Sequence, residues 1–393
     1  MNSIKDKCAI VGIGQTDFMV NSGRDRLALA LEAITNAVND AGLNIKDIDG
    51  IVKYTIDSSA SVEIIAANLG LNNVSYWGET YMGGGSSCAS VAQAALAIDG
   101  GMANCVVCYR AFTPFDFLDG ARHNSTTLWA RDAGSGDFLR PFGWWSMTDN
   151  FAMCCRRHMH EYGTTSRQLG AIAVACRKHA SMNPKAIRRK PITIDDHQNS
   201  PIVSDPLREL DTPIVPNDGA CAVVVTSAER AKDFKRRPAY IMAAAQALGS
   251  DPPPWWDFWA FRPVITEWEH KYLAPKLFSM AGITPKDIDV AEIYDCYTYT
   301  LLVQLEDYGF CKKGEGGPFV ENGNIELGGK LPVNTHGGHL GEAYMHGFTH
   351  ILEGVRQIRG TSTAQVKDAE LVLVTGGVPA PTSALILRRL KNE

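Results

Sequence analysis

Several short segments of this chain hold residue types that could carry out chemistry. The glycines Gly83, Gly84 and Gly85 come directly before Ser86, at the expected start of a helix. Glycine lets a backbone approach a ligand closely, and the free N–H groups at the start of a helix can stabilise negative charge. These four residues are therefore predicted to bind substrate.

Cys88 lies just beyond the glycines and is a candidate nucleophile. A thiolate near the first turn of a helix has a lowered pKa and attacks carbonyl carbons readily. The place of Cys88 inside the predicted helix, one turn after its start, argues against this role. Cys88 stays open as the alternative to a mechanism without a covalent intermediate.

Histidines are dense between His336 and His350, and His346 with His350 has the i, i+4 spacing of a metal pair on a helix. The glutamate of a His-Glu-x-x-His motif is absent, because Phe348 and Thr349 lie in that interval. We therefore predict histidines that line a site or are buried with partners, and no bound metal.

A basic run contains Arg188 and Arg189. Guanidinium groups bind phosphate oxygens through paired hydrogen bonds, so this run could hold a phosphorylated ligand. A solvated loop is the other interpretation.

An internal repeat indicates how the elements are arranged. Residues 41–52 and 281–293 share an Ala-Gly pair, a short turn, the sequence Lys-Asp-Ile-Asp and an apolar run. Each copy predicts a helix that ends at glycine and a buried strand that follows. Helices over 90–98 and 347–358 are each expected to lead to a strand, at 105–109 and 371–375. The chain thus resolves into two β/α halves with mostly parallel strands.

The first half is interrupted by residues 112–216, an aromatic and basic segment in which 151–160 and 165–178 have helical periodicity. This segment is predicted to be an inserted loop domain that covers a site. The first half then comprises residues 1–111 and 217–237, and the second comprises residues 238–393. A stretch rich in proline and tryptophan, 251–259, either lines a pocket for a bulky apolar substrate or packs in a core or interface.

The composition excludes several classes of protein. Of 393 residues, 45% are hydrophobic and 21% charged, and the formal net charge of −5 leaves no basic surplus for nucleic acid. No stretch reaches the ~18 apolar residues of a membrane span, and the first residues do not have the pattern of a secretory leader. We expect a cytoplasmic protein with reduced, buried cysteines and no membrane or nucleic-acid partner.

Beyond this duplicated plan, two segments resemble motifs of the thiolase superfamily, and the resemblance covers nearly the whole chain. Thiolases carry an Asn-Glu-Ala-Phe segment just after the repeated strand, and Tyr294 stands here in place of its asparagine. They also carry a Gly-Gly pair followed six residues later by a catalytic histidine; Gly337 and Gly338 match the pair, and Tyr344 stands in place of the histidine.

The resemblance also gives the positions in this chain that correspond to the two catalytic cysteines of thiolases. Neither position holds a cysteine. Gly84 stands where the nucleophile opens the helix, and Thr375 stands near the position of the second cysteine. These departures rule against ordinary thiolase chemistry, which needs an acylated thiol.

Tyrosines at both motif positions, with glycine at the cysteine position, are similar to the lipid-transfer-protein-like steroid side-chain aldolases of the superfamily. This resemblance implies the thiolase fold, with mixed five-stranded sheets in αβαβα layers. It also implies retro-aldol cleavage of a bulky β-hydroxyacyl-CoA. Tyr294 and Tyr344 would be the acid and base, with Gly84 leaving space for substrate. Because an unperturbed phenol has a pKa near 10, a working base needs its pKa lowered by neighbours or acts through water. His346, two residues beyond Tyr344, is the expected source of this help.

Two alternatives stay open. An atypical thiolase, similar to the thiolase subunit of benzoylsuccinyl-CoA thiolase, would use free coenzyme A or Cys88. A non-catalytic scaffold that binds acyl-CoA would explain the loss of both cysteines.

The resemblance further implies a homodimer core that forms a heterotetramer with a small OB-fold zinc-ribbon protein. No permanently bound cofactor is expected, and coenzyme A enters as part of the substrate or as co-substrate. Arg188 and Arg189 would contact its phosphates, and Gly337 and Gly338 would lie along the bound thioester.

Overall fold

The computed structural model describes residues 4–55, 59–81, 83–113, 140–144, 146–213, 217–249 and 264–390. The proline- and tryptophan-rich stretch at 251–259, for which the sequence offers two interpretations, lies outside these residues. Within them, no helix combines the length and the apolar character needed to cross a membrane.

The first half is built from these elements: β1 (Cys8–Gln15), α1 (Arg26–Ala41), β2 (Gly50–Thr55), α2 (Val62–Leu69), β3 (Tyr76–Tyr81), α3 (Ser86–Asp99), β4 (Cys105–Phe112), β7 (Gly219–Ser227) and α9 (Ala228–Ala231). The intervening segment forms α6 (Met147–Tyr162), α7 (Ser166–Met182), α8 (Ile194–Asn199) and a small hairpin of β5 (Ile202–Ser204) and β6 (Leu207–Arg208). The second half consists of β8 (Ala239–Ala247), α10 (His270–Ala281), β9 (Val290–Glu292), α11 (Thr298–Asp307), α12 (Gly316–Val320), α13 (Gly338–Gly341), α14 (Phe348–Arg359), β10 (Leu371–Gly376) and β11 (Thr382–Arg388).

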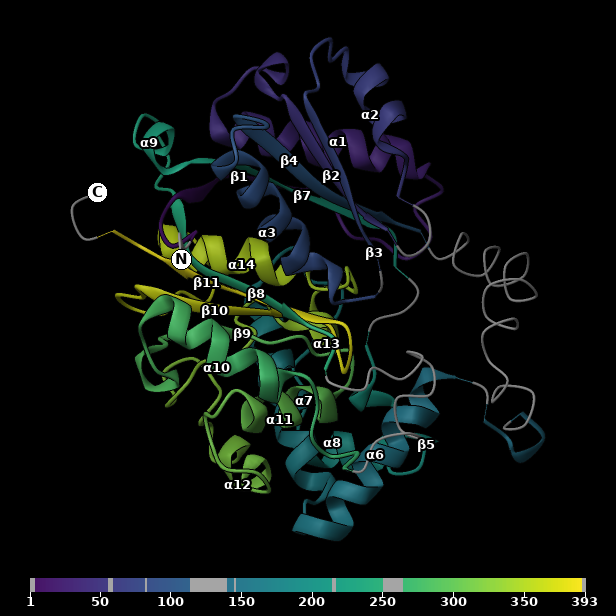
Figure 1. Cartoon of the computed structure of the whole chain (residues 1–393). Helices are drawn as coiled ribbons and strands as arrows, with labels where there is room; N and C mark the ends of the chain where they lie inside the picture. Colours follow the sequence, from purple (N-terminus) through teal and green to yellow (C-terminus); the bar gives the residue numbers. More distant parts are fainter. Residues whose placement is uncertain are drawn as a thin grey trace.

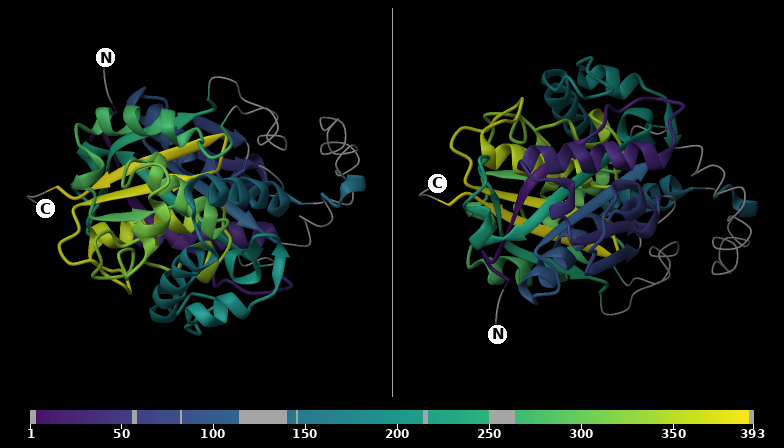
Figure 2. Two further views of the ribbon diagram at one scale, coloured as in Figure 1. Left: turned by 90° about the horizontal axis from the view of Figure 1, so that it is seen from below. Right: turned by 90° about the horizontal axis from the view of Figure 1, so that it is seen from above.

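The two halves form alternating layers of helices and strands (Figure 1). Helix α1 packs on the outer face of the first-half strands, as the view from above in Figure 2 also shows. Helices α3 and α14 lie together in the middle and share one apolar core with strands of both halves. Helices α10 and α11 belong to a third core on the far side of the second-half strands. This arrangement confirms the predicted αβαβα order.

The strands are hydrogen-bonded into one nine-stranded sheet, in the order β3-β2-β4-β7-β1-β8-β11-β10-β9. The first five belong to the first half, as predicted. The second half has four named strands, and a bridge between Ala291 and Val333 occupies the fifth position. The halves are joined where β1 and β8 pair over only two residue pairs, Ala9 with Tyr240 and Ile10 with Ala239. The two predicted sheets are thus joined through this short junction.

The internal repeat corresponds to equivalent structure. Helices α1 and α10 both end at a glycine in the left-handed region, Gly42 at φ 73° and Gly282 at φ 74°. The following aspartates then cap a neighbouring parallel strand. Asp49 accepts the N–H of Cys105 at 2.8 Å, and Asp289 accepts the N–H of Leu371 at 2.9 Å. The repeat therefore fixes the register of the two strand pairs β2–β4 and β9–β10.

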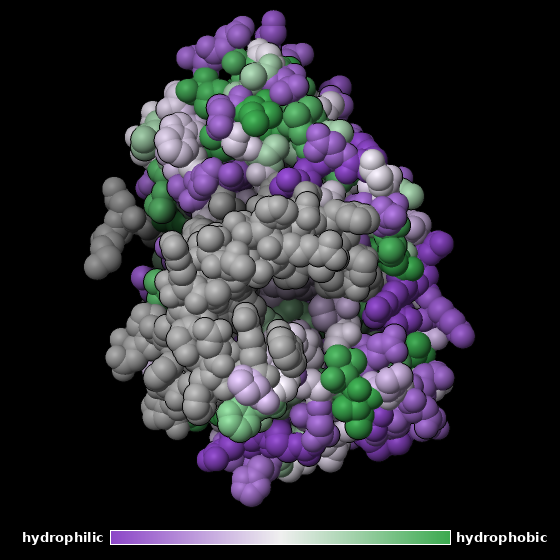
Figure 3. All heavy atoms as spheres, turned by 90° about the vertical axis from the view of Figure 1, so that its right-hand side faces the viewer, coloured by the Kyte–Doolittle hydropathy of each residue, from purple (hydrophilic) through white to green (hydrophobic). Residues whose placement is uncertain are grey.

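The inserted segment packs on the second half. Helix α7 contacts α11, α12 and α13, so the segment closes over the loop that holds Gly337 and Tyr344. On the face drawn in Figure 3, the described surface is mostly hydrophilic, with smaller hydrophobic groups between.

Candidate active site

The two tyrosines at the motif positions come together. The hydroxyl of Tyr294, just after β9, lies 3.2 Å from the hydroxyl of Tyr344, just after α13. Tyr294 is buried and Tyr344 is partly buried. Two loops from distant parts of the sequence thus place a pair of phenols in hydrogen-bond contact.

Polar side chains hold the backbone of both tyrosines. Thr375 Oγ1 accepts the N–H of Tyr294 at 2.9 Å, and Gln304 Nε2 donates to the carbonyl of Tyr294 at 2.7 Å. Thr375 in turn donates to Gln304 Oε1 at 2.7 Å. The N–H of Tyr344 donates to Asn217 Oδ1 at 2.9 Å. Thr375, which the thiolase resemblance places near the second cysteine, therefore anchors Tyr294.

Gly84 lies directly against the ring of Tyr294. A Cβ at position 84 would overlap Cε2, Cζ and the hydroxyl oxygen of Tyr294. The prediction that Gly84 leaves room for substrate is wrong, because the phenol fills this space. The glycine is needed here for the close approach of a side chain of the same protein.

Gly83, Gly85 and Ser86, on either side of Gly84, make contacts within the protein. Gly83 has a φ of 51°, and a Cβ on Gly85 would overlap the carbonyl of Pro381. Ser86 is buried, and its N–H donates to the carbonyl of Gly83 at 3.1 Å. The N–H groups of Ser87 and Ala89 also have acceptors within the protein, at 3.3 and 3.2 Å. The oxyanion role predicted for the start of the helix therefore does not fall to these three N–H groups.

Cys88 has the surroundings of a structural thiol. Its side chain is fully buried in the core between α3 and α14, and Sγ lies 3.6 Å from the carbonyl of Val374. Burial raises the pKa of the thiol to about 12. A nucleophilic cysteine needs the opposite shift and access to substrate.

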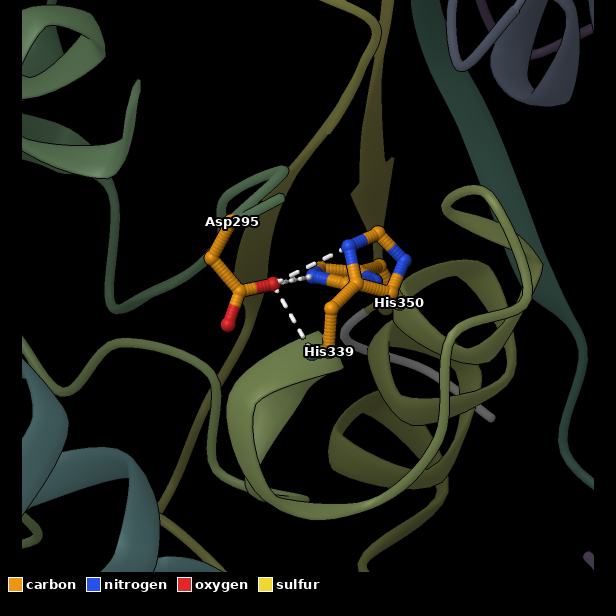
Figure 4. Close-up of side chains that lie close together, drawn as sticks. All are labelled: Asp295, His339 and His350. Atoms are coloured by element: carbon orange, nitrogen blue, oxygen red, sulfur yellow. Dashed lines mark hydrogen bonds and ion pairs between the residues drawn. The ribbon is translucent and has the colours of Figure 1, made fainter. Parts of the chain in front are cut away.

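Beneath the tyrosines, Asp295 joins two imidazoles (Figure 4). Its Oδ1 accepts the backbone N–H of His339 at 2.9 Å and His350 Nε2 at 3.0 Å. His339 Nδ1 lies 3.3 Å from the same oxygen. The His339 ring then packs edge-on against both phenols, with centroid distances of 4.7 Å to Tyr294 and 4.8 Å to Tyr344. Asp295 and its histidines thus support both tyrosines from one side.

Hydrogen bonds assign the protons of these imidazoles. The N–H of Gly347 donates to His339 Nε2 at 2.9 Å, so the neutral ring carries its proton on Nδ1, facing Asp295. His350 Nε2 lies between two acceptors, Asp295 Oδ1 and the carbonyl of Ile293 at 3.1 Å, and therefore carries a proton. Ligand-type atoms of the three side chains lie within 4.8 Å of one another, the spacing of a metal site. The hydrogen bond from His350 Nε2 and the approach of His339 Nδ1 to the same carboxylate account for this closeness.

His346 and His350 do not share a helix face. Helix α14 begins at Phe348, so His346 lies before it. His350 is directed to Asp295, whereas His346 Nδ1 lies 3.1 Å from Nη2 of Arg110. The i, i+4 spacing therefore has no metal-pair geometry here.

Burial governs protonation at this site. It raises the pKa of Tyr294 and of Tyr344 well above the ordinary phenol value. It also lowers the pKa of His339 well below the ordinary value, with further lowering by the neighbouring histidines. Both phenols and the His339 ring are therefore neutral at neutral pH. The prediction of a lowered Tyr344 pKa is wrong, because burial outweighs assistance from neighbours.

The glycine pair and the basic run lie around the same loop. Gly337 and Gly338 have φ of 108° and 63°; a Cβ would overlap Ala180 at the first and Asp295 at the second. The pair thus allows close packing beneath the tyrosine loop. The N–H of Arg188, a partly buried residue, donates to the carbonyl of Gly341 at 3.0 Å.

Arg189 is exposed next to Arg188. Contact of either side chain with coenzyme A stays a prediction.

Sequence reasoning did not identify Asp295, His339 or Arg110. Asp295 directly follows Tyr294, and His339 directly follows the glycine pair, so the motifs themselves pointed to both. Arg110 is a charged residue inside the otherwise uncharged strand β4, a position that needs a buried partner.

Comparison with known proteins gives the family. The family model described as thiolase C-terminal domain-like matches residues 262–389. The chain is 45% identical over 388 residues to 17-hydroxy-3-oxo-4-pregnene-20-carboxyl-CoA lyase of Mycobacterium tuberculosis, covering 98% of this chain and 100% of that protein. It is 44% identical to a steroid side-chain-cleaving aldolase of Thermomonospora curvata, covering 98% and 99%.

A solved structure agrees with this assignment. The Ltp2-ChsH2(DUF35) aldolase superposes with a TM-score of 0.91 at 43% identity, covering 100% of both chains. The chain therefore belongs to the thiolase superfamily, in the branch of the steroid side-chain-cleaving aldolases.

Proposed function

We propose that this enzyme cleaves the Cα–Cβ bond of a bulky β-hydroxyacyl-CoA by a retro-aldol reaction, with Tyr294 and Tyr344 transferring the proton. The contact of 3.2 Å between the two hydroxyls carries the proposal. The substrate class follows the 17-hydroxy steroid thioester in the name of the relative, in which a hydroxyl stands β to the thioester carbonyl. A polycyclic acyl group is therefore the first choice.

The reaction conserves protons and electrons without a cofactor. The O–H bond of the β-hydroxyl breaks, and its electron pair forms the new ketone. The electrons of the Cα–Cβ bond pass into an enolate of the thioester, which takes up one proton at the α-carbon. The products are a ketone and a shortened acyl-CoA, and no free coenzyme A is consumed.

Both phenols are neutral at the start, which determines how they work. One tyrosine accepts the proton of the β-hydroxyl while it passes its own proton across the hydrogen bond to the second tyrosine. The second tyrosine delivers a proton to the α-carbon. Because each phenol gains a proton as it loses one, no phenolate has to form in this buried site. Raised tyrosine pKa values are therefore compatible with catalysis.

The alternatives need features that the described site does not offer. Acylation of Cys88 requires an accessible thiolate, and this thiol is buried with a raised pKa. Direct attack by free coenzyme A on a β-ketoacyl-CoA is the remaining thiolase reaction, and a test without free coenzyme A separates it from retro-aldol cleavage. Pure scaffolding leaves the tyrosine pair without a role.

The proposed assembly of this chain with a partner is based on the solved aldolase. The solved aldolase pairs a chain of this type with ChsH2(DUF35), so we propose a small OB-fold zinc-ribbon partner and a homodimer core for this chain. Arg188 and Arg189 are proposed to contact the phosphates of coenzyme A, because they border the loop that carries Tyr344.

Co-purified enzyme and partner, assayed with a polycyclic β-hydroxyacyl-CoA, test the function directly. Ketone release without free coenzyme A is expected, and Tyr294→Phe and Tyr344→Phe are each expected to reduce kcat by about 10²- to 10⁴-fold. Tyr299→Phe is the matched control, because Tyr299 is a buried tyrosine that faces His158 and Trp268. Cleavage restricted to a β-keto substrate with added coenzyme A would replace this function by thiolysis.

A further inference from the structure

Asn334 lies at the point where the chain leaves the sheet and enters the loop that carries Tyr344. Its backbone N–H donates to the carbonyl of Ala291 on β9 at 3.1 Å, next to the bridge between Ala291 and Val333. The φ of Asn334 is 50°, in the left-handed region that asparagine adopts more readily than most residues. The N–H of Gly337 donates to the carbonyl of Asn334 at 2.8 Å and closes a turn. The backbone therefore pairs with β9 up to Asn334 and then turns away.

The side chain of Asn334 continues the pairing that its backbone leaves. Its Oδ1 accepts the N–H of Ile293 at 2.7 Å, and its Nδ2 donates to the carbonyl of the same residue at 2.8 Å. A carboxamide has the donor and the acceptor of a peptide group, so these two bonds imitate those of a neighbouring strand. Asn334 is fully buried, where an unpaired peptide group is costly. It thus fixes the peptide groups on both sides of Ile293, directly before Tyr294.

Through these contacts, Asn334 joins the two loops that carry the tyrosines. Its side chain holds the residue before Tyr294, and its backbone begins the loop that leads to Tyr344. Asp295 makes a second link just beyond Tyr294, where its Oδ1 accepts the N–H of His339 at 2.9 Å. Tyr294 is therefore enclosed between two links to the loop of Tyr344.

A histidine of the inserted segment holds the turn at Asn334. His179, near the end of α7, is fully buried, and its Nδ1 lies 3.2 Å from the carbonyl of Asn334. The N–H of Leu327 donates to Nε2 of His179 at 3.0 Å, so the neutral ring carries its proton on Nδ1 and donates it to that carbonyl. Burial lowers the pKa of His179, which favours this neutral form. The inserted segment thereby helps to keep Asn334 in place.

We infer that Asn334 is a positioning residue that sets the distance between the hydroxyls of Tyr294 and Tyr344. The inference rests on the proposed function, because proton transfer between the two phenols requires their contact of 3.2 Å. A displacement of about 1 Å is enough to break such a contact and can lower a rate by about 10²-fold. Asn334 acts through the backbone that carries the phenols.

Steady-state kinetics separate the side chain of Asn334 from its backbone conformation. Asn334→Gly keeps a residue that adopts a positive φ but removes both bonds to Ile293. We expect kcat to fall by about 10- to 10²-fold with little change in KM, because the loss affects the reacting groups rather than substrate binding. Asn322→Gly is the matched control, because Asn322 is an exposed asparagine with a φ of 57°. A kcat of Asn334→Gly equal to that of the control would overturn the inference.

A crystal structure of Asn334→Gly tests the positioning role without turnover. We expect the hydroxyls of Tyr294 and Tyr344 to separate beyond about 3.5 Å, so that their hydrogen bond is lost. An unchanged separation of 3.2 Å in the variant would contradict the role assigned to Asn334.

Thermal unfolding shows whether each variant folds. Should Asn334→Gly not fold, Asn334→Asp takes its place, because aspartate keeps the size of the side chain and the acceptor for the N–H of Ile293. The carboxylate has no donor for the carbonyl of Ile293, so the same fall in kcat and the same separation of the hydroxyls are expected. Parent-like values of both quantities in Asn334→Asp would overturn the inference.

The two proposals fail differently. A parent enzyme that does not cleave the hydroxy substrate refutes the proposed function, while the structure of the variant still tests the distance between the phenols. An active parent enzyme whose Asn334 variant keeps both its kcat and the contact of the two hydroxyls refutes only this inference.

Discussion

The phenol ring of Tyr294 occupies the space that any side chain at position 84 would need. The thiolase resemblance places a nucleophilic cysteine at this position, and a side chain there would overlap the ring of Tyr294. The observed placement of Tyr294 is therefore incompatible with a cysteine at position 84.

The first prediction concerns Gly84 and Tyr294. Gly84→Ala should displace the ring of Tyr294, break its contact with Tyr344 and lower kcat by at least about 10²-fold, as expected for loss of a general acid–base group. The same substitution made in a Tyr294→Ala background should cost little additional stability, because the overlap is gone. Unfolding free energies of the two single variants and the double variant measure this coupling. Additive effects would mean that the two positions do not compete for space.

The second prediction is the pH dependence of catalysis. Since burial raises the pKa of both tyrosines, neither ionises between pH 7 and pH 9. A neutral relay then gives a flat profile of kcat/KM over this range. A mechanism that needs a phenolate would instead give a rate that rises about tenfold per pH unit. Initial rates at constant ionic strength distinguish the two profiles.

The third prediction concerns Asp295. Asp295→Asn replaces one acceptor oxygen of the carboxylate by a donor NH2 group. The neighbouring groups themselves donate hydrogen bonds to this carboxylate. We expect a loss of about 3 kcal/mol in unfolding free energy, as for other broken buried networks. A lower kcat should accompany it, since His339 supports both phenols. As a control, Asp196→Asn alters an exposed helix-capping carboxylate away from the site. Equal stability of the two variants would show that Asp295 is dispensable.

The fourth prediction uses Glu292, at the end of β9 beneath the tyrosine loop. Its side chain is fully buried, Thr335 Oγ1 donates to Oε1 at 2.8 Å, and burial together with Glu353 raises its pKa to about 8. Between the unfolded value near 4.5 and this folded value, the folded state holds a proton that the unfolded state lacks. The contribution of Glu292 to stability should therefore be fully present below about pH 4.5 and decrease as the pH rises towards 8.

Glu292→Gln imitates the protonated carboxyl and should remove this dependence, which is at most about 1.4 kcal/mol per pH unit. Chemical denaturation at pH 5, 6, 7 and 8 measures the slope, with Glu229→Gln as a control at an exposed position. An unchanged slope in Glu292→Gln would show that this carboxyl is ionised in the folded protein.

Local patterns in the sequence were sufficient for the architecture. The duplicated Ala-Gly turn and the apolar run after Lys-Asp-Ile-Asp predicted equivalent helices and strands, because a glycine C-cap and an apolar run act on the backbone within a few residues of themselves. The motif positions also located Tyr294 just after a strand and Tyr344 six residues after a glycine pair. These features depend on backbone preferences and on order along the chain.

Tertiary structure decided what these residues do. Only the packed loops show that Tyr294 fills the space at Gly84, that both phenols are held neutral, and that Cys88 is sealed in the core. The same packing turns His346 towards Arg110 and directs His350 and His339 to Asp295. Burial, close approach and pKa shifts all arise from groups far apart in sequence. Spacing along the chain could therefore identify the candidate residues but not the atoms that carry their protons.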